Sequence, residues 1–165
     1  MYPGQNLYGY VVGQNTPEIR NRKAFHDYHI VERMEAGIKL SGTEVKSVRE
    51  GRVSMRDSHV EFEKGEAALI GLSIANYINR GYADHHTHRP RKLLMHRREI
   101  KKWAHRVLEK GYTVVPLRVY FNDRGYAKVE IALVQGKRQY DKRKAIAERE
   151  SKRDLDRAKK EANRW

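Results

Sequence analysis

Two runs of alternating apolar residues, at 112–121 and 126–134, restrict the fold of this chain more than any other feature. Apolar side chains recur at every second position of both runs, as expected for strands with one buried face. The polar residues between them, 122–125, are typical of a turn, so the two runs predict an antiparallel hairpin. The alternating residues are Val115, Leu117, Val119 and Phe121 in the first run and Val129, Ile131 and Leu133 in the second.

The first half of the chain carries shorter signals of secondary structure. Residues 28–34 and 37–40 have the composition of strands that lead to a turn. Ser41 and Glu44 then have the spacing of a capping box, in which each side chain accepts a hydrogen bond from the backbone of the other residue. This spacing predicts a short helix over about 43–50.

Further signals continue the pattern into the second half. Two strands are expected near 58–63 and 67–74, joined by residues 64–66. Residues 76–92 carry Asn, Gly, His, Arg and Pro, and are expected to form a long irregular segment. A helix is expected over about 96–110, because apolar residues fall near one helical face. These residues are Leu94, Ile100, Trp103, Val107 and Leu108.

Together these signals predict a mainly β fold with about six short strands and two to three helices. Short strands with helices between them favour a closed or partly open antiparallel β-barrel over a parallel sheet. The composition divides the chain into a flexible arm at 1–19, a barrel domain at 20–136 and a basic tail at 137–165.

The charge of the chain indicates the kind of partner. Lys and Arg number 35 against 21 Asp and Glu, so the formal net charge is +14. Such an excess attracts polyanions, of which nucleic acid is the usual one and an anionic membrane surface the alternative. No run approaches the roughly 18 apolar residues of a membrane span, and the start of the chain lacks a signal-peptide pattern. We therefore expect a cytoplasmic protein with no membrane partner.

Several kinds of chemistry are not expected. The chain has no cysteine, which excludes thiol catalysis and cysteine-ligated zinc. His85, His86 and His88 lie close together, but neighbours on one loop rarely complete a coordination shell, so a basic loop near RNA is the better interpretation. His26 and Asp27 resemble a general-base pair, yet no serine or cysteine nucleophile accompanies them. We expect no metal, no cofactor and no enzyme activity.

The tail at 137–165 differs from the rest of the chain. Its 12 basic and 6 acidic side chains supply +6 of the net charge. Ala, Glu, Lys and Arg give it high helix propensity, but its few aliphatic residues cannot form a core-facing stripe. Because short helices without packing are marginal in water, we expect the tail to be disordered when free and helical when bound to a phosphate backbone.

Four segments, in order along about residues 21–160, match the motifs of one known family. Residues 21–28 resemble its N-x-K-A-x-H-[DE]-Y opening, and residues 35–47 resemble E-A-G-[IL]-x-L-x-G-x-E-V-K-S. Residues 89–94 are similar to R-T-R-K-L-L, and residues 136–143 to G-K-K-x-[HY]-D-K-R. The family is small protein B, whose members bind transfer-messenger RNA (SsrA RNA).

The resemblance implies an oligonucleotide-binding-type barrel that grips the tRNA-like part of transfer-messenger RNA. It also implies delivery of this RNA, with elongation factor Tu, to stalled ribosomes for trans-translation, in which incomplete peptides are tagged. The tail would occupy the empty mRNA path near the decoding centre and fold there into a helix. We expect a monomer.

The resemblance also implies two sets of binding residues. Four positions align with those that the family uses for transfer-messenger RNA, and Lys23 and His26 can extend that surface. The expected contacts to this RNA are Asn21, Lys23, His26, Glu35, Leu94 and Lys128. The expected ribosome-binding residues are Gly136, Lys137, Arg138, Tyr140, Asp141, Lys142, Arg143 and Ile146.

Each side chain has a chemistry that suits its expected role. Lys128 can pair with phosphate, and Leu94 can contact an exposed base. Glu35 can accept hydrogen bonds from exocyclic amines or 2′-hydroxyls, or brace a neighbouring Arg. Tyr140 lies among four cations and can stack on a base. Ile146 can be an apolar contact of the bound tail helix.

Simpler interpretations stay open at this point. Leu94 can be a core residue, Glu35 a solvated turn carboxylate and Tyr140 an apolar anchor of the tail on the barrel. The cations of the tail can be an ordinary solvated charge run. For the whole protein, the alternative is a general basic RNA chaperone or ribosomal protein without a preferred RNA. A nuclease is less favoured, because no carboxylate cluster for magnesium stands out.

Overall fold

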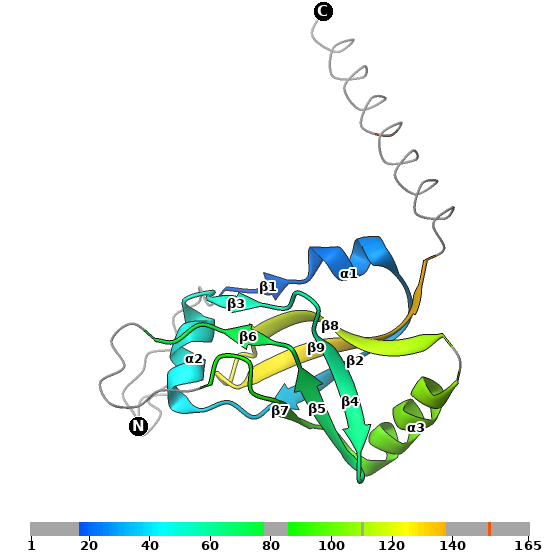
Figure 1. The fold of residues 1–165 in the computed structure, drawn as a ribbon. Helices are drawn as coiled ribbons and strands as arrows, with labels where there is room; N and C mark the ends of the chain where they lie inside the picture. Colours follow the sequence, from blue (N-terminus) through cyan, green and yellow to red (C-terminus); the bar gives the residue numbers. More distant parts are fainter. Residues whose placement is uncertain (1–16, 78–85, 110, 138–151, 153–165) are drawn as a thin grey trace, which may run out of the picture.

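The computed structural model describes residues 17–77, 86–109, 111–137 and 152. An antiparallel seven-stranded sheet dominates, in the order β1-β8-β9-β2-β7-β5-β4, and β3 pairs with β6 in a second small sheet (Figure 1). The strands are β1 (Ile19–Arg20), β2 (Tyr28–Ile38), β3 (Val53–Ser54), β4 (His59–Glu63), β5 (Glu66–Ile70), β6 (Ser73–Ile74), β7 (Arg91–Leu94), β8 (Tyr112–Phe121) and β9 (Ala127–Gly136). The helices are α1 (Arg22–Asp27), α2 (Gly42–Arg49) and α3 (Arg97–Leu108).

The predicted hairpin is confirmed as β8 and β9, which pair antiparallel from Phe121 opposite Ala127 to Tyr112 opposite Gln135. Strand β2 extends the sheet on the other side of β9, and its two predicted pieces form one continuous strand. At the far end of the order, β4 lies against β8 and crosses it in Figure 1. The sheet therefore curls toward closure, and the predicted mainly β fold with few helices is confirmed. The part of the chain that the structure describes has nine strands rather than about six.

The alternation along the hairpin is broken where a helix covers its outer face. Val115 and Leu117 pack with Ala24 of α1, whereas Val119 packs in the main core with Trp103 of α3. A shift of register between Pro116 and Arg118 separates the two groups. The middle of β8 is consequently buried on both faces.

Helix α2 confirms the predicted capping box. The side chain of Ser41 accepts a hydrogen bond from the backbone N–H of Glu44, whose carboxylate accepts one from the backbone of Ser41 at 2.8 Å. Helix α1 was not predicted, although Asn21 is a favoured N-cap residue. Its Oδ1 accepts a hydrogen bond from the backbone N–H of Ala24 at 3.2 Å.

The predicted strand at 67–74 is wrong in its second half. β5 ends at Ile70, because Gly71 adopts a φ of +75° that turns the chain. Residues 73–74 form β6 and pair with β3 instead of continuing along β4.

The region before α3 also differs from its prediction. The expected irregular segment 76–92 gives way at Arg91 to β7, which joins β2 to β5. Leu94 belongs to this strand and not to the helical face. Of the residues expected on the helical face, Ile100 and Trp103 are buried in α3, whereas Leu108 is 84% exposed. The helix begins at Arg97, where Glu99 accepts a hydrogen bond from the backbone N–H of His96 at 2.9 Å.

No helix within residues 17–77, 86–109 and 111–137 is long and apolar enough to span a membrane.

Candidate nucleic-acid interface

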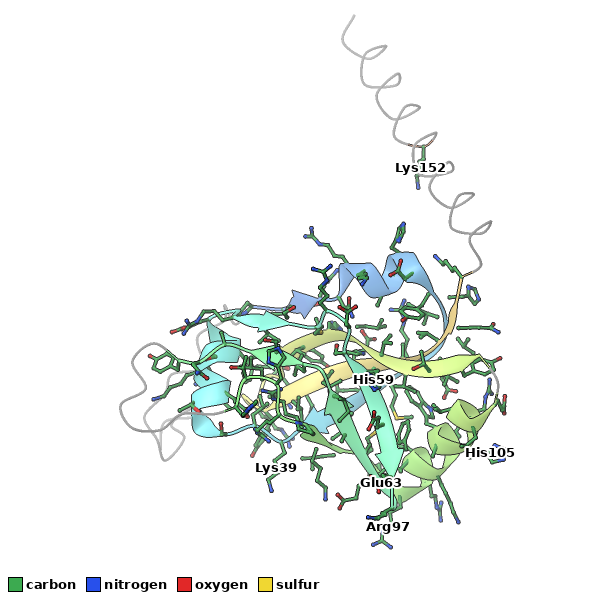
Figure 2. The ribbon with its side chains drawn as sticks, viewed as in Figure 1. Lys39, His59, Glu63, Arg97, His105 and Lys152 are labelled. Atoms are coloured by element: carbon green, nitrogen blue, oxygen red, sulfur yellow. The ribbon has the colours of Figure 1, made fainter. Side chains whose placement is uncertain are left out.

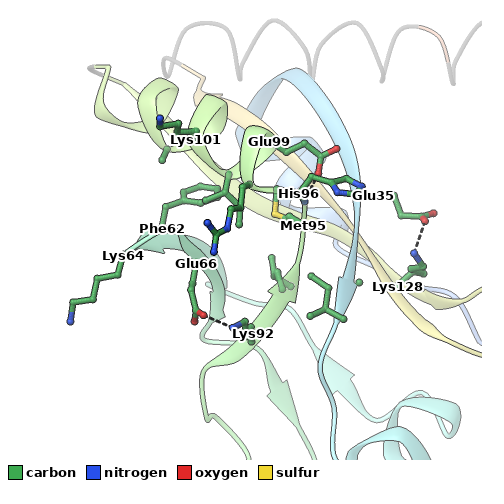
Figure 3. A pocket seen from close by; sticks show the side chains of 17 residues that line it. Glu35, Phe62, Lys64, Glu66, Lys92, Met95, His96, Glu99, Lys101 and Lys128 are labelled. Carbon is green, nitrogen blue, oxygen red and sulfur yellow. Dashed lines mark hydrogen bonds and ion pairs between the residues drawn. The ribbon is translucent and has the colours of Figure 1, made fainter.

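An open groove of about 1210 Å³ lies between the outer face of the sheet and the start of α3 (Figure 3). Strands β2, β5, β7 and β9 supply its floor, and Arg97, Ile100 and Lys101 of α3 supply one wall. Three of the six residues expected to contact RNA line this groove. They are Glu35, Leu94 and Lys128.

Strand register explains why Glu35 and Lys128 meet. Gly37 lies opposite Lys128 in the β2–β9 ladder, so Glu35 two residues away on the same face is a diagonal neighbour of Lys128. The Nζ of Lys128 lies 3.2 Å from Oε1 of Glu35, the contact drawn in Figure 3. The Glu35 side chain remains 51% exposed, so the pair faces the groove. Of the alternative interpretation, a solvated turn carboxylate, the turn is wrong, because Glu35 lies within β2, although its side chain is exposed to solvent.

Tyr120 holds the other oxygen of this carboxylate. Its hydroxyl donates a hydrogen bond to Oε2 of Glu35 from β8, which lies on the other side of β9 from β2. This hydrogen bond, with the contact from Lys128, holds the pKa of Glu35 below its ordinary value. Burial and the hydrogen bond to Glu35 raise the pKa of Tyr120 to about 12. Near neutral pH Glu35 is therefore ionised and Tyr120 protonated, which is the combination that this hydrogen bond requires.

The polar network continues beyond Tyr120. Arg118 lies over the Tyr120 ring at 4.6 Å from its centroid and donates to Glu130 at 2.9 Å. It also contacts Glu18 at 3.3 Å. Its charge is thus shared between two carboxylates, and its guanidinium covers the ring of the tyrosine that donates to Glu35.

Leu94 presents an apolar surface beside this polar pair. It lies opposite Gly37 in the β2–β7 ladder and is 57% exposed, so the core interpretation of Leu94 is wrong. A Cβ added to Gly37 would lie 3.1 Å from Cβ of Leu94. The missing side chain of Gly37 therefore lets Leu94 approach β2 closely.

Asn21 and Lys23 line a different, smaller pocket of about 320 Å³. Asn21 is occupied within the protein: besides capping α1, its Nδ2 donates to the carbonyl of Pro116 at 2.9 Å. Lys23 pairs with Asp57 at 2.9 Å, and Nδ1 of His26 lies 2.9 Å from Oδ1 of Asp27. Because α1 lies on β8 and the groove lies beside α3, the structure does not bring the six expected residues into one site.

Comparison with known proteins identifies the family. The model of the family described as SmpB protein matches residues 18–161. The chain belongs to the SmpB protein family. An SsrA-binding protein of Moorella thermoacetica is 53% identical over 141 residues, which cover 86% of this chain and 91% of the relative. An SsrA-binding protein of Roseiflexus sp. is 54% identical over 145 residues, covering 87% and 91%.

A solved structure has the same fold. It is described as "tmRNA-SmpB: a journey to the center of the bacterial ribosome", and the chain resembles it with a TM-score of 0.65 and 48% identity. The match covers 79% of this chain and 94% of the solved one.

The expected tail residues of this SmpB family member lie mostly outside the described residues. Arg138, Tyr140, Asp141, Lys142, Arg143 and Ile146 all do so. Gly136 is the last residue of β9, and Lys137 is held to α1: its N–H donates to the carbonyl of Asp27 at 3.1 Å, and its Nζ lies 3.3 Å from the carbonyl oxygen of Phe25. Lys137, the last described residue after β9, therefore lies at the end of the barrel that carries α1.

The histidines expected in a basic loop are only partly described. His85 lies outside the described residues, and His86 and His88 are exposed. Within the described ranges, no group of three or more His, Asp or Glu side chains is arranged to hold a metal ion.

One functional support was missed from the sequence: a buried ionic cluster of Glu44, Arg89 and Arg91. Glu44 and Arg91 are fully buried, and Nε of Arg91 donates to Oε1 of Glu44 at 3.0 Å. Arg89 donates to the same carboxylate at 2.9 Å, while Arg91 also donates to the carbonyl of Thr87 at 2.9 Å. Burial opposes ionisation, but these cations and the Ser41 N–H bring the pKa of Glu44 below its ordinary value. The cluster fixes β7, and hence Leu94, relative to α2.

Proposed function

We propose that this chain binds transfer-messenger RNA and delivers it to stalled ribosomes for trans-translation. The observation that carries the proposal is the groove that unites Glu35, Leu94 and Lys128 in a chain of the SmpB family. The relatives named above are SsrA-binding proteins, and the solved structure concerns tmRNA, SmpB and the ribosome. We further propose that the chain acts as a cytoplasmic monomer, without catalysis, and with elongation factor Tu in the delivered complex.

The chemistry of the groove suits a folded RNA with exposed bases. An isolated carboxylate would repel phosphate, but Lys128 neutralises Glu35. Half of the Glu35 side chain nevertheless remains exposed. The pair can accept hydrogen bonds from base amines or 2′-hydroxyls without adding net negative charge. Leu94 beside it can pack against an unstacked base. Selection then depends on base and sugar contacts, and not on charge alone.

We propose that the surface of α1 is a second RNA contact. Lys23 and His26 are exposed there and carry the polar atoms that meet the RNA. Asn21 contributes by fixing the start of α1 against β8, since its side chain bonds to Ala24 and Pro116.

We propose that the tail from 137 to 165 occupies the empty mRNA path near the decoding centre. Its +6 charge suits ribosomal RNA, and the anchoring of Lys137 beside α1 supports a fixed point of departure. The tail residues proposed to meet the ribosome are Gly136, Lys137, Arg138, Tyr140, Asp141, Lys142, Arg143 and Ile146.

Removal of residues 138–165 tests this division of labour. Lys137 is retained because it is bonded to Asp27 and Phe25. The truncated protein is expected to keep its affinity for transfer-messenger RNA nearly intact and to lose the tagging of stalled peptides. Loss of RNA affinity on truncation would contradict the proposed roles of barrel and tail.

The +14 charge also supports a second candidate, a general RNA chaperone or ribosomal protein without a preferred RNA. Salt dependence does not separate the two, because any protein that neutralises about eight phosphates has a log–log slope near −6 to −7. Competition with an excess of bulk tRNA does separate them. The proposed function predicts retained binding to transfer-messenger RNA, and the chaperone predicts its displacement.

A further inference from the structure

The floor of the groove is nearly neutralised by its own ion pairs. Lys128 pairs with Glu35, and Lys92 pairs with Glu66, both as drawn in Figure 3. Lys64 at the turn between β4 and β5 lies 3.3 Å from Glu63. These cations are therefore not free to attract phosphate at full strength.

The wall formed by α3 is different. Arg97 and Lys101 line the groove and are exposed, and within the described part of the chain neither has an ion pair. Arg98 and His105 are also exposed on this helix, and Figure 2 shows Arg97 and His105 directed away from the barrel. Glu99 does not neutralise them fully, since its carboxylate accepts the hydrogen bond from His96 at the start of the helix.

Spacing makes this wall a continuous stripe. Positions 97, 101 and 105 are one turn apart on one side of α3, and the first two line the groove about 6 Å apart along the helix axis. Lys102, next to Lys101, faces a different neighbour and pairs with Glu32 of β2 at 2.7 Å. Among the described residues, Lys101 therefore has no ion pair, whereas the adjacent Lys102 has one.

We propose that Arg97 and Lys101 bind the sugar–phosphate backbone of the RNA whose bases reach Glu35 and Leu94. This inference rests on the proposed function and adds to it a phosphate-binding wall that runs along α3. The apolar and hydrogen-bonding floor reads the bases, while the free cations of the wall hold the strand that carries them. The cations of the wall complement RNA phosphates, and the wall lines the same groove as Glu35 and Leu94, so we assign it to transfer-messenger RNA.

The matched substitutions Lys101→Gln and Lys102→Gln test the wall in the full-length protein. Both remove one positive charge from adjacent positions of one helix, so net charge and helix propensity change alike. Binding to transfer-messenger RNA is measured as a function of salt concentration. Lys101→Gln is expected to make the log–log slope less negative by about 0.7–0.9, the change for one lost phosphate contact, while Lys102→Gln leaves it unchanged.

The double variant Arg97→Gln/Lys101→Gln enlarges the signal. It is expected to change the slope by about 1.5 and to weaken binding about tenfold near physiological salt. The control Arg97→Lys/Lys101→Arg keeps both charges and is expected to have the same slope as the wild type. Equal slopes for Lys101→Gln and Lys102→Gln, or a defect seen only with ribosomes, would overturn the wall.

The same measurements separate this inference from the proposed function. Preference for transfer-messenger RNA over bulk tRNA tests the function, whereas the slope can be measured on either RNA. If the wild type prefers transfer-messenger RNA but Lys101→Gln does not change the slope, the proposed function stands and the phosphate-binding wall is refuted. If the wild type shows no preference but Lys101→Gln changes the slope, the proposed function is refuted and the phosphate-binding wall stands.

Discussion

Glu44→Gln is expected to destabilise the fold more than any surface change in this chain. The substitution keeps the size of the side chain, and Gln is an accepted residue at the third position of a capping box. It removes the only carboxylate that faces Arg91 among the contacts described, while Arg91 itself stays fully buried. Removing one partner of a buried pair leaves an uncompensated charge and costs about 3–5 kcal/mol.

Urea unfolding measures this cost against a matched control. With an m-value of about 2 kcal/mol/M, a loss of about 4 kcal/mol moves the midpoint by about 2 M. Glu66→Gln breaks the exposed pair with Lys92, where Glu66 is 62% and Lys92 47% exposed, and is expected to cost about 0–1 kcal/mol. Similar midpoints for Glu44→Gln and Glu66→Gln would refute the reasoning.

Two further observations keep the prediction testable if Glu44→Gln fails to fold. In Glu44→Met/Arg91→Met, both buried charges are replaced by apolar groups, and part of the lost stability is expected to return, because Arg89 is 35% exposed and can reach water. The pH dependence has a definite sign. The folded-state pKa of Glu44 lies below its unfolded value, so its contribution is present above the unfolded pKa and is lost as pH falls through the folded one. The difference between wild type and Glu44→Gln should therefore shrink in acid.

Three other substitutions have expected outcomes. Tyr120→Phe removes the hydrogen bond to Glu35, so the pKa of Glu35 should rise in an NMR titration and affinity for transfer-messenger RNA should fall severalfold, whereas Tyr126→Phe, at an exposed tyrosine of the same hairpin, should change neither. Gly71→Ala places a Cβ 3.0 Å from the carbonyl oxygen of Asp57 at a φ of +75°, and should lower the free energy of unfolding by about 1–3 kcal/mol in urea titrations; an unchanged midpoint would contradict the need for glycine. Asn21→Ala removes the cap of α1 together with the hydrogen bond to Pro116 and should cost about 0.5–2 kcal/mol, whereas Asn21→Ser, which keeps a capping oxygen, should cost less.

The hairpin and α2 were predictable because their signals are local. Alternation at every second residue and the Ser41–Glu44 spacing depend on neighbouring residues alone. Strand β7 was missed for the opposite reason. Its four residues end two residues before a helix, and its apolar Leu94 also fits the helical period, so only pairing with β2 and β5 identifies it as a strand.

The candidate site likewise combines features that the sequence indicates with contacts that only the fold creates. The resemblance to the family points to Glu35, Leu94 and Lys128 one by one, but their meeting in a groove depends on the order β9-β2-β7 in the sheet. The contact from Tyr120 depends on β8 lying next to β9, and no motif indicates it. The cluster around Glu44 joins residues 45 and 47 positions apart, so its carboxylate could be interpreted only as a helix cap.

The ratio of affinities for transfer-messenger RNA and bulk tRNA tests the central claim most directly. It should be measured for wild type, for Glu35→Ala/Lys128→Ala and for Glu66→Ala/Lys92→Ala, which removes another ion pair from the same groove at the same cost in charge. We predict a strong preference in wild type and in Glu66→Ala/Lys92→Ala, and a ratio near one in Glu35→Ala/Lys128→Ala with its thermal stability retained. A preference that survives the loss of Glu35 and Lys128, or that falls equally in both double variants, would contradict the assignment of RNA selection to this pair.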